Sequence, residues 1–120
     1  MEKGFDVFLI DPFEKKISVV YYDGNFKSIY SIIDCKLFDA TPPFNNRGDA
    51  VVVDDVGIYK KEQKFFSIKG YSYPLAGKGI VIGCDFSTGD DRPPFITLED
   101  LVKNVRWLGN LPPQLRRTEL

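Results

Sequence analysis

Two strand-like segments of this 120-residue chain carry apolar side chains at both odd and even positions. Residues 5–10 read FDVFLI and residues 16–22 read KISVVYY, with a short polar link between them. Successive side chains of a strand point to opposite faces of a sheet, so a strand that is apolar at both parities needs cover on both faces. The two segments therefore predict an antiparallel hairpin at the centre of a sheet or on an oligomer surface.

The remaining strand candidates are short and are separated by turn residues. Strands are expected at 36–40, 50–53, 65–68 and 79–85. The sequence DDVG at 54–57 predicts a turn that folds AVVV back onto IYKK as a second hairpin. The stretches on either side of FFSI are expected to be irregular.

Two segments have helical spacing instead. In residues 23–35, which begin with an Asp-Gly-Asn turn and N-cap, apolar side chains recur at i, i+3, i+4 and i+7 as Phe26, Ile29, Tyr30 and Ile33. Residues 97–107 open with Thr97 as an N-cap and with acids in the first turn. These patterns predict an α+β domain over residues 1–109, a mainly antiparallel sheet with two helices packed against it. Residues 110–120 are expected to form a C-terminal arm.

Charge, histidine and cysteine content argue against several classes of function. Lys and Arg total 16 and Asp and Glu total 17, whereas nucleic-acid binders usually show a basic excess. No apolar run approaches the roughly 20 residues that span a bilayer. The chain has no histidine, which removes the Ser-His-Asp and Cys-His nucleophile systems. Cys35 and Cys84 are expected to be buried free thiols in a reducing cytoplasm. We therefore expect a protein that is not an enzyme and that has no metal, cofactor or membrane contact.

The glycine-and-lysine turn at residues 76–79 is the segment that most resembles a phosphate-binding loop. A P-loop needs Gly-x4-Gly-Lys-Ser/Thr ahead of a helix. Here Gly79 follows Lys78 and a strand is expected next, so the nucleotide-hydrolase reading is rejected. Two readings remain: an anion site made of backbone N–H groups and Lys78, or a glycine-permitted turn before a buried strand.

Aromatic and basic residues are concentrated in two predicted loops and around the second helix. Aromatic faces and guanidinium groups suit a planar base and its phosphates. The same residue types are preferred anchors of protein interfaces, and hydrophobic plugs and a solvated tail are the third reading. The ligand-binding candidates are Phe44, Asn46, Arg47, Lys78, Phe86, Arg92, Arg106 and Trp107. The tripeptide RGD at 47–49 is interpreted as a chance match.

Three segments carry a family resemblance: VFLIDPFEKKISVVYYDGNFKSIYSIIDCKLFD, GDAVVVDDVGIYKK and LAGKGIVIGCD. Together they resemble a broad group of small phage- and prophage-encoded proteins, over about residues 5–108. The loop TPPFNNR and the tail after Gly109 do not match the pattern. The resemblance brings no catalytic residues; it implies a phage accessory protein, including one that counters a bacterial defence.

These observations favour a homo-oligomeric counter-defence protein that sequesters a nucleotide-derived immune signal in the host cytoplasm. The first alternative is an inhibitor that binds a defence or host enzyme directly through its tail and exposed aromatics. The second is a small metal-dependent phosphodiesterase that uses the adjacent pairs Asp54-Asp55 and Asp90-Asp91. Nucleic acid is not an expected partner.

Overall fold

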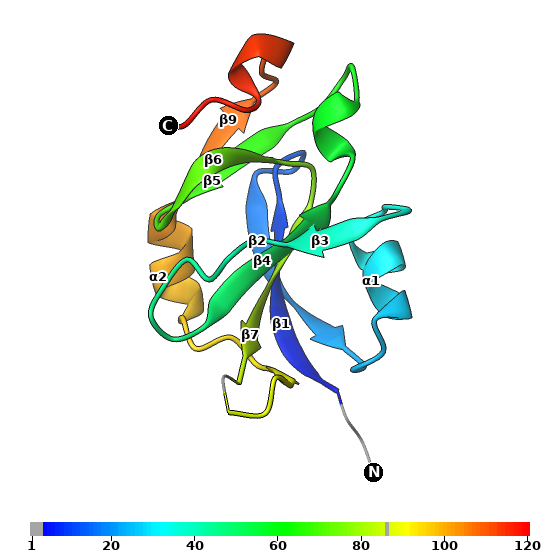
Figure 1. Ribbon diagram of the computed structural model, residues 1–120, viewed down its shortest axis with the longest axis vertical. Helices are drawn as coiled ribbons and strands as arrows, with labels where there is room; N and C mark the ends of the chain where they lie inside the picture. The colour runs from blue at the N-terminus through cyan, green and yellow to red at the C-terminus, as the bar shows by residue number, and fades with distance from the viewer. Residues whose placement is uncertain (1–3, 86) are drawn as a thin grey trace.

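An antiparallel sheet forms the centre of the molecule (Figure 1). The computed structural model describes residues 4–85 and 87–120. Its larger sheet has six strands in the order β2-β1-β7-β4-β3, with β8 paired to β7, and its smaller sheet has the order β6-β5-β9. The strands are β1 (Phe5–Asp11), β2 (Lys16–Tyr22), β3 (Phe38–Ala40), β4 (Asp49–Asp54), β5 (Phe65–Ile68), β6 (Tyr71–Ala76), β7 (Gly79–Cys84), β8 (Asp91–Arg92) and β9 (Val105–Gly109). The helices are α1 (Lys27–Ile32) and α2 (Leu98–Asn104), and the 3-10 helices are η1 (Gly57–Tyr59) and η2 (Pro113–Leu115).

The central strands β1, β4 and β7 of the larger sheet are buried on both faces, whereas Val19 of the edge strand β2 is 50% exposed, so the expected cover on both faces holds for β1 and not for β2. In β4, Val51 packs into one buried cluster and Val52 into another on the opposite face. In β7, Val81 packs into the same cluster as Val51, and Ile80 packs into the same cluster as Val52. The expected α+β fold class and the β1–β2 hairpin are confirmed, with β1 central and β2 at the edge.

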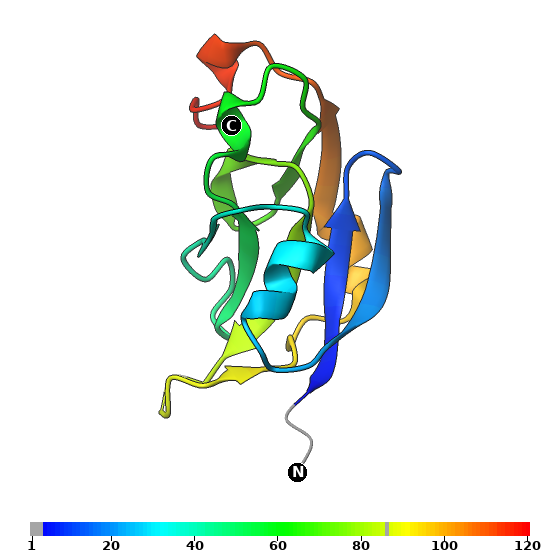
Figure 2. The same ribbon diagram turned by 90° about the vertical axis from the view of Figure 1, so that its right-hand side faces the viewer.

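Helix α1 covers one face of the larger sheet (Figure 2). Ile29 and Ile33 are buried there, and the ring of Tyr30 lies 5.0 Å from that of Phe38. The predicted apolar face is confirmed for these three residues, whereas Phe26 is 56% exposed. The helix itself is shorter than the segment 23–35.

The smaller sheet and α2 cover the opposite face. Phe66 of β5 and Leu101 of α2 are fully buried in one cluster with residues of β1, β4 and β7. The expected N-cap is confirmed, because Thr97 Oγ1 accepts a hydrogen bond from the Asp100 N–H at 3.1 Å. This arrangement places a second layer of strands against the central sheet.

Three expectations about local structure are wrong. The chain does not form a hairpin after AVVV, because β4 pairs with β3 and β7 while residues 57–59 form η1. The segment after β5 is not irregular: it forms β6. The second helix ends at Asn104, and Trp107 lies in β9, opposite Phe66 of β5. Pairing with β5 satisfies the β9 backbone and overrides the helical spacing.

The tail folds back onto the domain instead of extending from it. Arg116 is 6% exposed, and its guanidinium donates hydrogen bonds of 2.7 Å to the carbonyls of Leu111 and Ile58. The same group lies 4.9 Å from the centre of the Phe65 ring. A backbone bond from Leu120 N–H to the Ser72 carbonyl also holds the tail. Among the described residues, no helix is long and apolar enough to cross a membrane.

Candidate functional site

The two predicted loops meet at a fully buried carboxylate, Asp49. Its oxygens accept hydrogen bonds from the Phe95 N–H and the Ile96 N–H, each at 2.8 Å, and from Asn45 Nδ2 at 3.0 Å. Arg92 Nη1 lies 3.5 Å from the same carboxylate. Asp49 therefore ties loop 41–48 to the segment that precedes α2. Its burial also agrees with reading RGD as a chance match.

The two loop arginines have different surroundings. Arg92 donates hydrogen bonds to the carbonyls of Arg47 and Pro93, so its guanidinium is engaged inside the loop junction. Arg47 is exposed, and its guanidinium lies 4.4 Å from the centre of the exposed Phe95 ring. Asn46 is exposed beside it. This corner presents one cation on one aromatic ring.

Two of the aromatic candidates pack against the core. Phe44 is 7% exposed and belongs to the core, where protein atoms cover its ring, so its contact with a ligand stays a prediction. Trp107 is half-buried and packs against the same core cluster. Phe86 lies outside the described residues. Neither Phe44 nor Trp107 is brought together with Arg47.

The glycine-lysine turn is a corner at which the chain leaves the smaller sheet and enters the larger one. Gly77 has φ +75°, a conformation that glycine adopts readily. A Cβ at Gly79 would lie 2.8 Å from Val51 Cγ1, so close packing requires glycine there. Lys78 lines a small cavity of about 60 Å³ that Asp34 and Asp54 also line. The geometry therefore matches the turn-before-strand reading.

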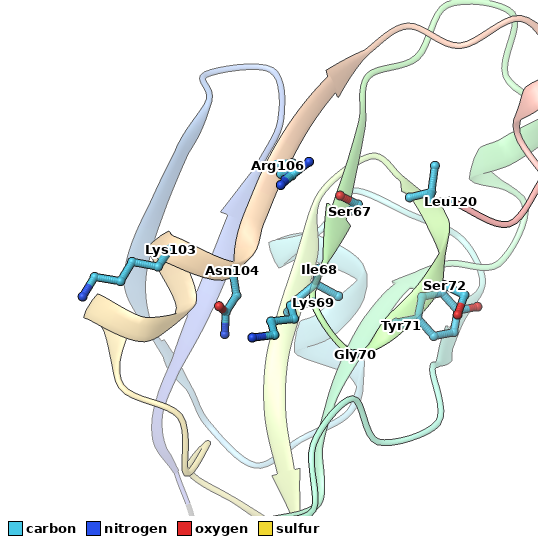
Figure 3. A pocket seen from close by; sticks show the side chains of 10 residues that line it. All are labelled: Ser67, Ile68, Lys69, Gly70, Tyr71, Ser72, Lys103, Asn104, Arg106 and Leu120. Atoms are coloured by element: carbon cyan, nitrogen blue, oxygen red, sulfur yellow. The ribbon is translucent and has the colours of Figure 1, made fainter.

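A larger depression, the basic groove, lies at the junction of the smaller sheet, α2 and the tail (Figure 3). Its volume is about 520 Å³. The β5–β6 turn, the end of α2, β9 and the tail meet around it. The lining residues are Ser67, Ile68, Lys69, Gly70, Tyr71, Ser72, Lys103, Asn104, Arg106 and Leu120.

The backbone fixes the relative positions of the groove side chains. The Lys69 N–H donates to the Asn104 carbonyl at 3.0 Å, which joins the β5–β6 turn to the end of α2. Gly70 has φ +100°, and a Cβ there would collide with the carbonyl oxygen of Phe44. Ser67 pairs with Arg106 across β5 and β9, so their side chains share one face.

The charged side chains that line the groove are all cations. Lys69, Lys103 and Arg106 carry the charge, and none of the described lining residues is Asp or Glu. Lys103 also pairs with Glu99 at 3.3 Å, although both side chains are exposed and such pairs are weak. Within the described chain, the side chains of Lys69 and Arg106 have no hydrogen-bond or ion-pair partner. An anion is the ligand that this arrangement suits.

Sequence reasoning identified Arg106 but missed Lys69, Lys103 and Asn104. Figure 3 shows Lys69 and Asn104 directed into the same space and Lys103 directed away from it. The available sequence signal was the pair of basic residues in KNVR together with the Lys-Gly turn after a strand.

In the first aspartate pair, Asp54 is held by local contacts. Asp54 accepts a hydrogen bond from the Val56 N–H at 3.0 Å and lies 3.5 Å from Lys60 Nζ. Burial, and then the neighbouring Asp90, raise the pKa of Asp91. Among the described residues, no three or more Asp, Glu, Cys or His side chains are grouped to hold a metal ion.

Comparisons of the chain with family models, with curated proteins and with solved structures found no match.

Proposed function

We propose that the protein binds and sequesters a nucleotide-derived anion in the basic groove, without catalysing its conversion. The observation that carries this proposal is a groove of about 520 Å³ that the unpaired cations Lys69 and Arg106 line, with no described Asp or Glu side chain in its lining. Ligand pockets of roughly 300–1,000 Å³ are typical for small molecules. The phage origin, the counter-defence role and the host cytoplasm rest on the family resemblance alone.

The groove offers each part of a nucleotide a suitable partner. Arg106 has a planar guanidinium that suits two phosphate oxygens, and Lys69 supplies a second charge. The amide of Asn104 can both donate to and accept from a base or ribose. The lining ring of Tyr71 is the aromatic surface available to a base there.

Isothermal calorimetry with ATP, a cyclic dinucleotide and pyrophosphate tests the proposal. Lys69→Ala and Arg106→Ala should each weaken nucleotide binding at least about tenfold, the loss expected for one charge-assisted contact. Arg47→Ala and Lys78→Ala are matched controls, because both cations lie outside the groove. The nucleotide released on denaturation should be chemically unchanged.

Binding that depends on Arg47 or Lys78 but not on Arg106 would refute the groove assignment. Turnover of the nucleotide would refute the sequestering role. No detectable binding of any of the three probes would leave no support for an anion site here.

Homo-oligomer formation is part of the proposal, and the edge strand β2 supports it. β2 ends the larger sheet, and Val19 on it is 50% exposed. Exposed apolar edges are common sites of strand pairing between chains. Light scattering should give a multimer for the native chain and a monomer for Val19→Lys.

A direct inhibitor of a defence or host enzyme is the second candidate. Its support is the exposed Tyr59, on which the Arg117 guanidinium stacks at 4.9 Å, next to a depression that η1 and the tail line. Aromatic and arginine side chains are frequent anchors at protein interfaces. Tyr59→Ala should then abolish a complex recovered from infected cells and leave nucleotide binding unchanged.

A further inference from the structure

A second cavity, here called the helix-side cavity, lies on the α1 face of the larger sheet. Its volume is about 470 Å³, and it is separate from the basic groove, with which it shares no lining residue. Elements β2, β3, β4, β7 and β8 contribute to it together with α1. The lining residues are Tyr22, Phe26, Ile29, Phe38, Asp39, Ala40, Thr41, Pro43, Gly48, Ala50, Val52, Ile82, Cys84 and Asp91.

Small side chains on the sheet leave the space that the cavity occupies. Ala50 of β4 is paired with Ile82 of β7, and Val52 lies two residues further on the same face. A larger side chain at Ala50 would fill the floor beside Ile82. The cavity is therefore built into a regular part of the sheet.

Apolar and aromatic groups form the walls. Tyr22 and Ile29 are almost fully buried, whereas Phe26 is exposed at the start of α1 and also lines the cavity. Phe26 occupies the outward end of the helical face that otherwise packs against the sheet. An apolar ligand would cover part of this exposed ring.

The charge in the cavity is negative. Asp91 is paired with Cys84 across β8 and β7, so both side chains lie on the cavity face. The next residue, Arg92, points to the opposite face, where it meets Asp49. Asp39 is the other charged lining residue, and none of the described lining residues is Lys or Arg.

Within residues 4–85 and 87–120, no cationic side chain forms an ion pair with Asp91. Burial, and secondly Asp90, raise the pKa of this carboxyl, and burial followed by Asp91 raises the pKa of Tyr22. Asp91 is nevertheless exposed, so its carboxylate lies on the cavity face while still in contact with solvent.

We propose that the helix-side cavity binds a small molecule with an aromatic or aliphatic body and a positively charged amine. The body lies on Ala50, Val52 and Ile82, and the amine pairs with Asp91. Burial of the body supplies most of the affinity, since removing apolar area from water favours binding. The carboxylate selects the charge of the ligand.

The charge of the lining argues against the occupant proposed for the basic groove. A nucleotide would bring its phosphates beside Asp91 and Asp39, where like charges repel. The two cavities therefore suit ligands of opposite charge.

A matched series of probes tests the proposal: 2-phenylethylamine, 2-phenylethanol and 3-phenylpropanoate. Titrations followed by amide NMR should give the order amine, alcohol, carboxylate, with at least a tenfold difference between the first and the last. Asp91→Asn should weaken the amine at least about fivefold and leave the alcohol unchanged. Asp55→Asn removes an exposed carboxylate that does not line the cavity and is the control.

Two further measurements locate the binding. Ala50→Leu should abolish binding of the amine and of the alcohol. The amine should slow alkylation of Cys84 by iodoacetamide and leave Cys35, which does not line the cavity, unaffected. The alkylation experiment uses the native chain, so it decides the location even where Ala50→Leu fails to fold.

Equal affinities for the three probes would overturn the proposal, as would no binding of the amine at 10 mM. Amine binding that leaves alkylation of Cys84 unchanged would also overturn it, because the amine would then bind elsewhere.

Discussion

Replacing Asp49 by Asn should destabilise the protein strongly, although the two side chains have nearly the same shape. Asp49 is fully buried, and its two oxygens accept three hydrogen bonds of 2.8–3.0 Å. Asn has one oxygen, so its NH₂ group must face at least one N–H donor. In the better orientation the oxygen keeps Ile96 and Asn45, and the NH₂ group opposes the Phe95 N–H.

The cost follows from counting these contacts. One buried N–H loses its partner, which costs about 1–3 kcal/mol. The two retained bonds lose the charge of their acceptor, and neutral bonds are weaker than charged ones by roughly 1 kcal/mol each. Arg92 Nη1 also loses the carboxylate at 3.5 Å. The sum is about 3–5 kcal/mol, the range found when a buried charge loses its partner.

Urea unfolding measures this loss. With a slope of about 2 kcal/mol per M, the midpoint of the Asp49→Asn variant should fall by roughly 1.5–2.5 M at an unchanged slope. Asp55→Asn is the matched control, because Asp55 is exposed, and its midpoint should not move. A fall of less than about 0.5 M for Asp49→Asn would refute the assignment of Asp49 as the junction of the two loops.

Three other predictions concern the tail, a helix cap and a carboxyl group. Arg116→Ala should lower the free energy of unfolding by about 2–4 kcal/mol, since several carbonyls lose their hydrogen-bond donor. Amide hydrogen exchange of residues 110–120 should be much faster in Arg116→Ala than in the control variant Arg117→Ala. Thr97→Ala should cost about 1 kcal/mol in thermal unfolding through loss of the N-cap bond. Hydrogen bonds from the Asn25 N–H, and then from Ser28, lower the pKa of Asp23 below 3.8. The ionised Asp23 therefore stabilises the folded state fully above pH 3.8, and this contribution is lost as pH falls through the lowered pKa. Ser28→Ala should raise this pKa towards 3.8 in an NMR titration; an unchanged pKa would contradict the reasoning.

The sequence predicted those features that depend on local pattern. The apolar residues at both parities of β1 and β2 indicated strands covered on both faces, which holds for β1 but not for the edge strand β2, and the spacing of Ile29 and Ile33 indicated α1. Each of these features can be read within about ten residues. Thr97 is a similar case, because its partner Asp100 is three residues away.

Features that depend on distant partners were missed. Val105 continues the apolar spacing of α2, yet it pairs with Ile68 of β5 and begins β9. Arg116 was expected in a C-terminal arm, yet its guanidinium donates hydrogen bonds to the carbonyls of Ile58 and Lys60, more than 50 residues earlier. In the candidate site, Lys69 and Asn104 meet through a backbone bond between segments 35 residues apart, which no spacing rule reveals.

The distribution of charge links the two proposed sites. A net charge of −1 argued only against a general nucleic-acid binder. In the structure, cations line the basic groove and carboxylates line the helix-side cavity, so the near-neutral total conceals two local fields of opposite sign. Each field acts over roughly 10 Å at 0.1 M salt. Added salt should therefore weaken the binding of both a nucleotide and an amine, whereas Arg106→Ala should affect the nucleotide alone and Asp91→Asn the amine alone.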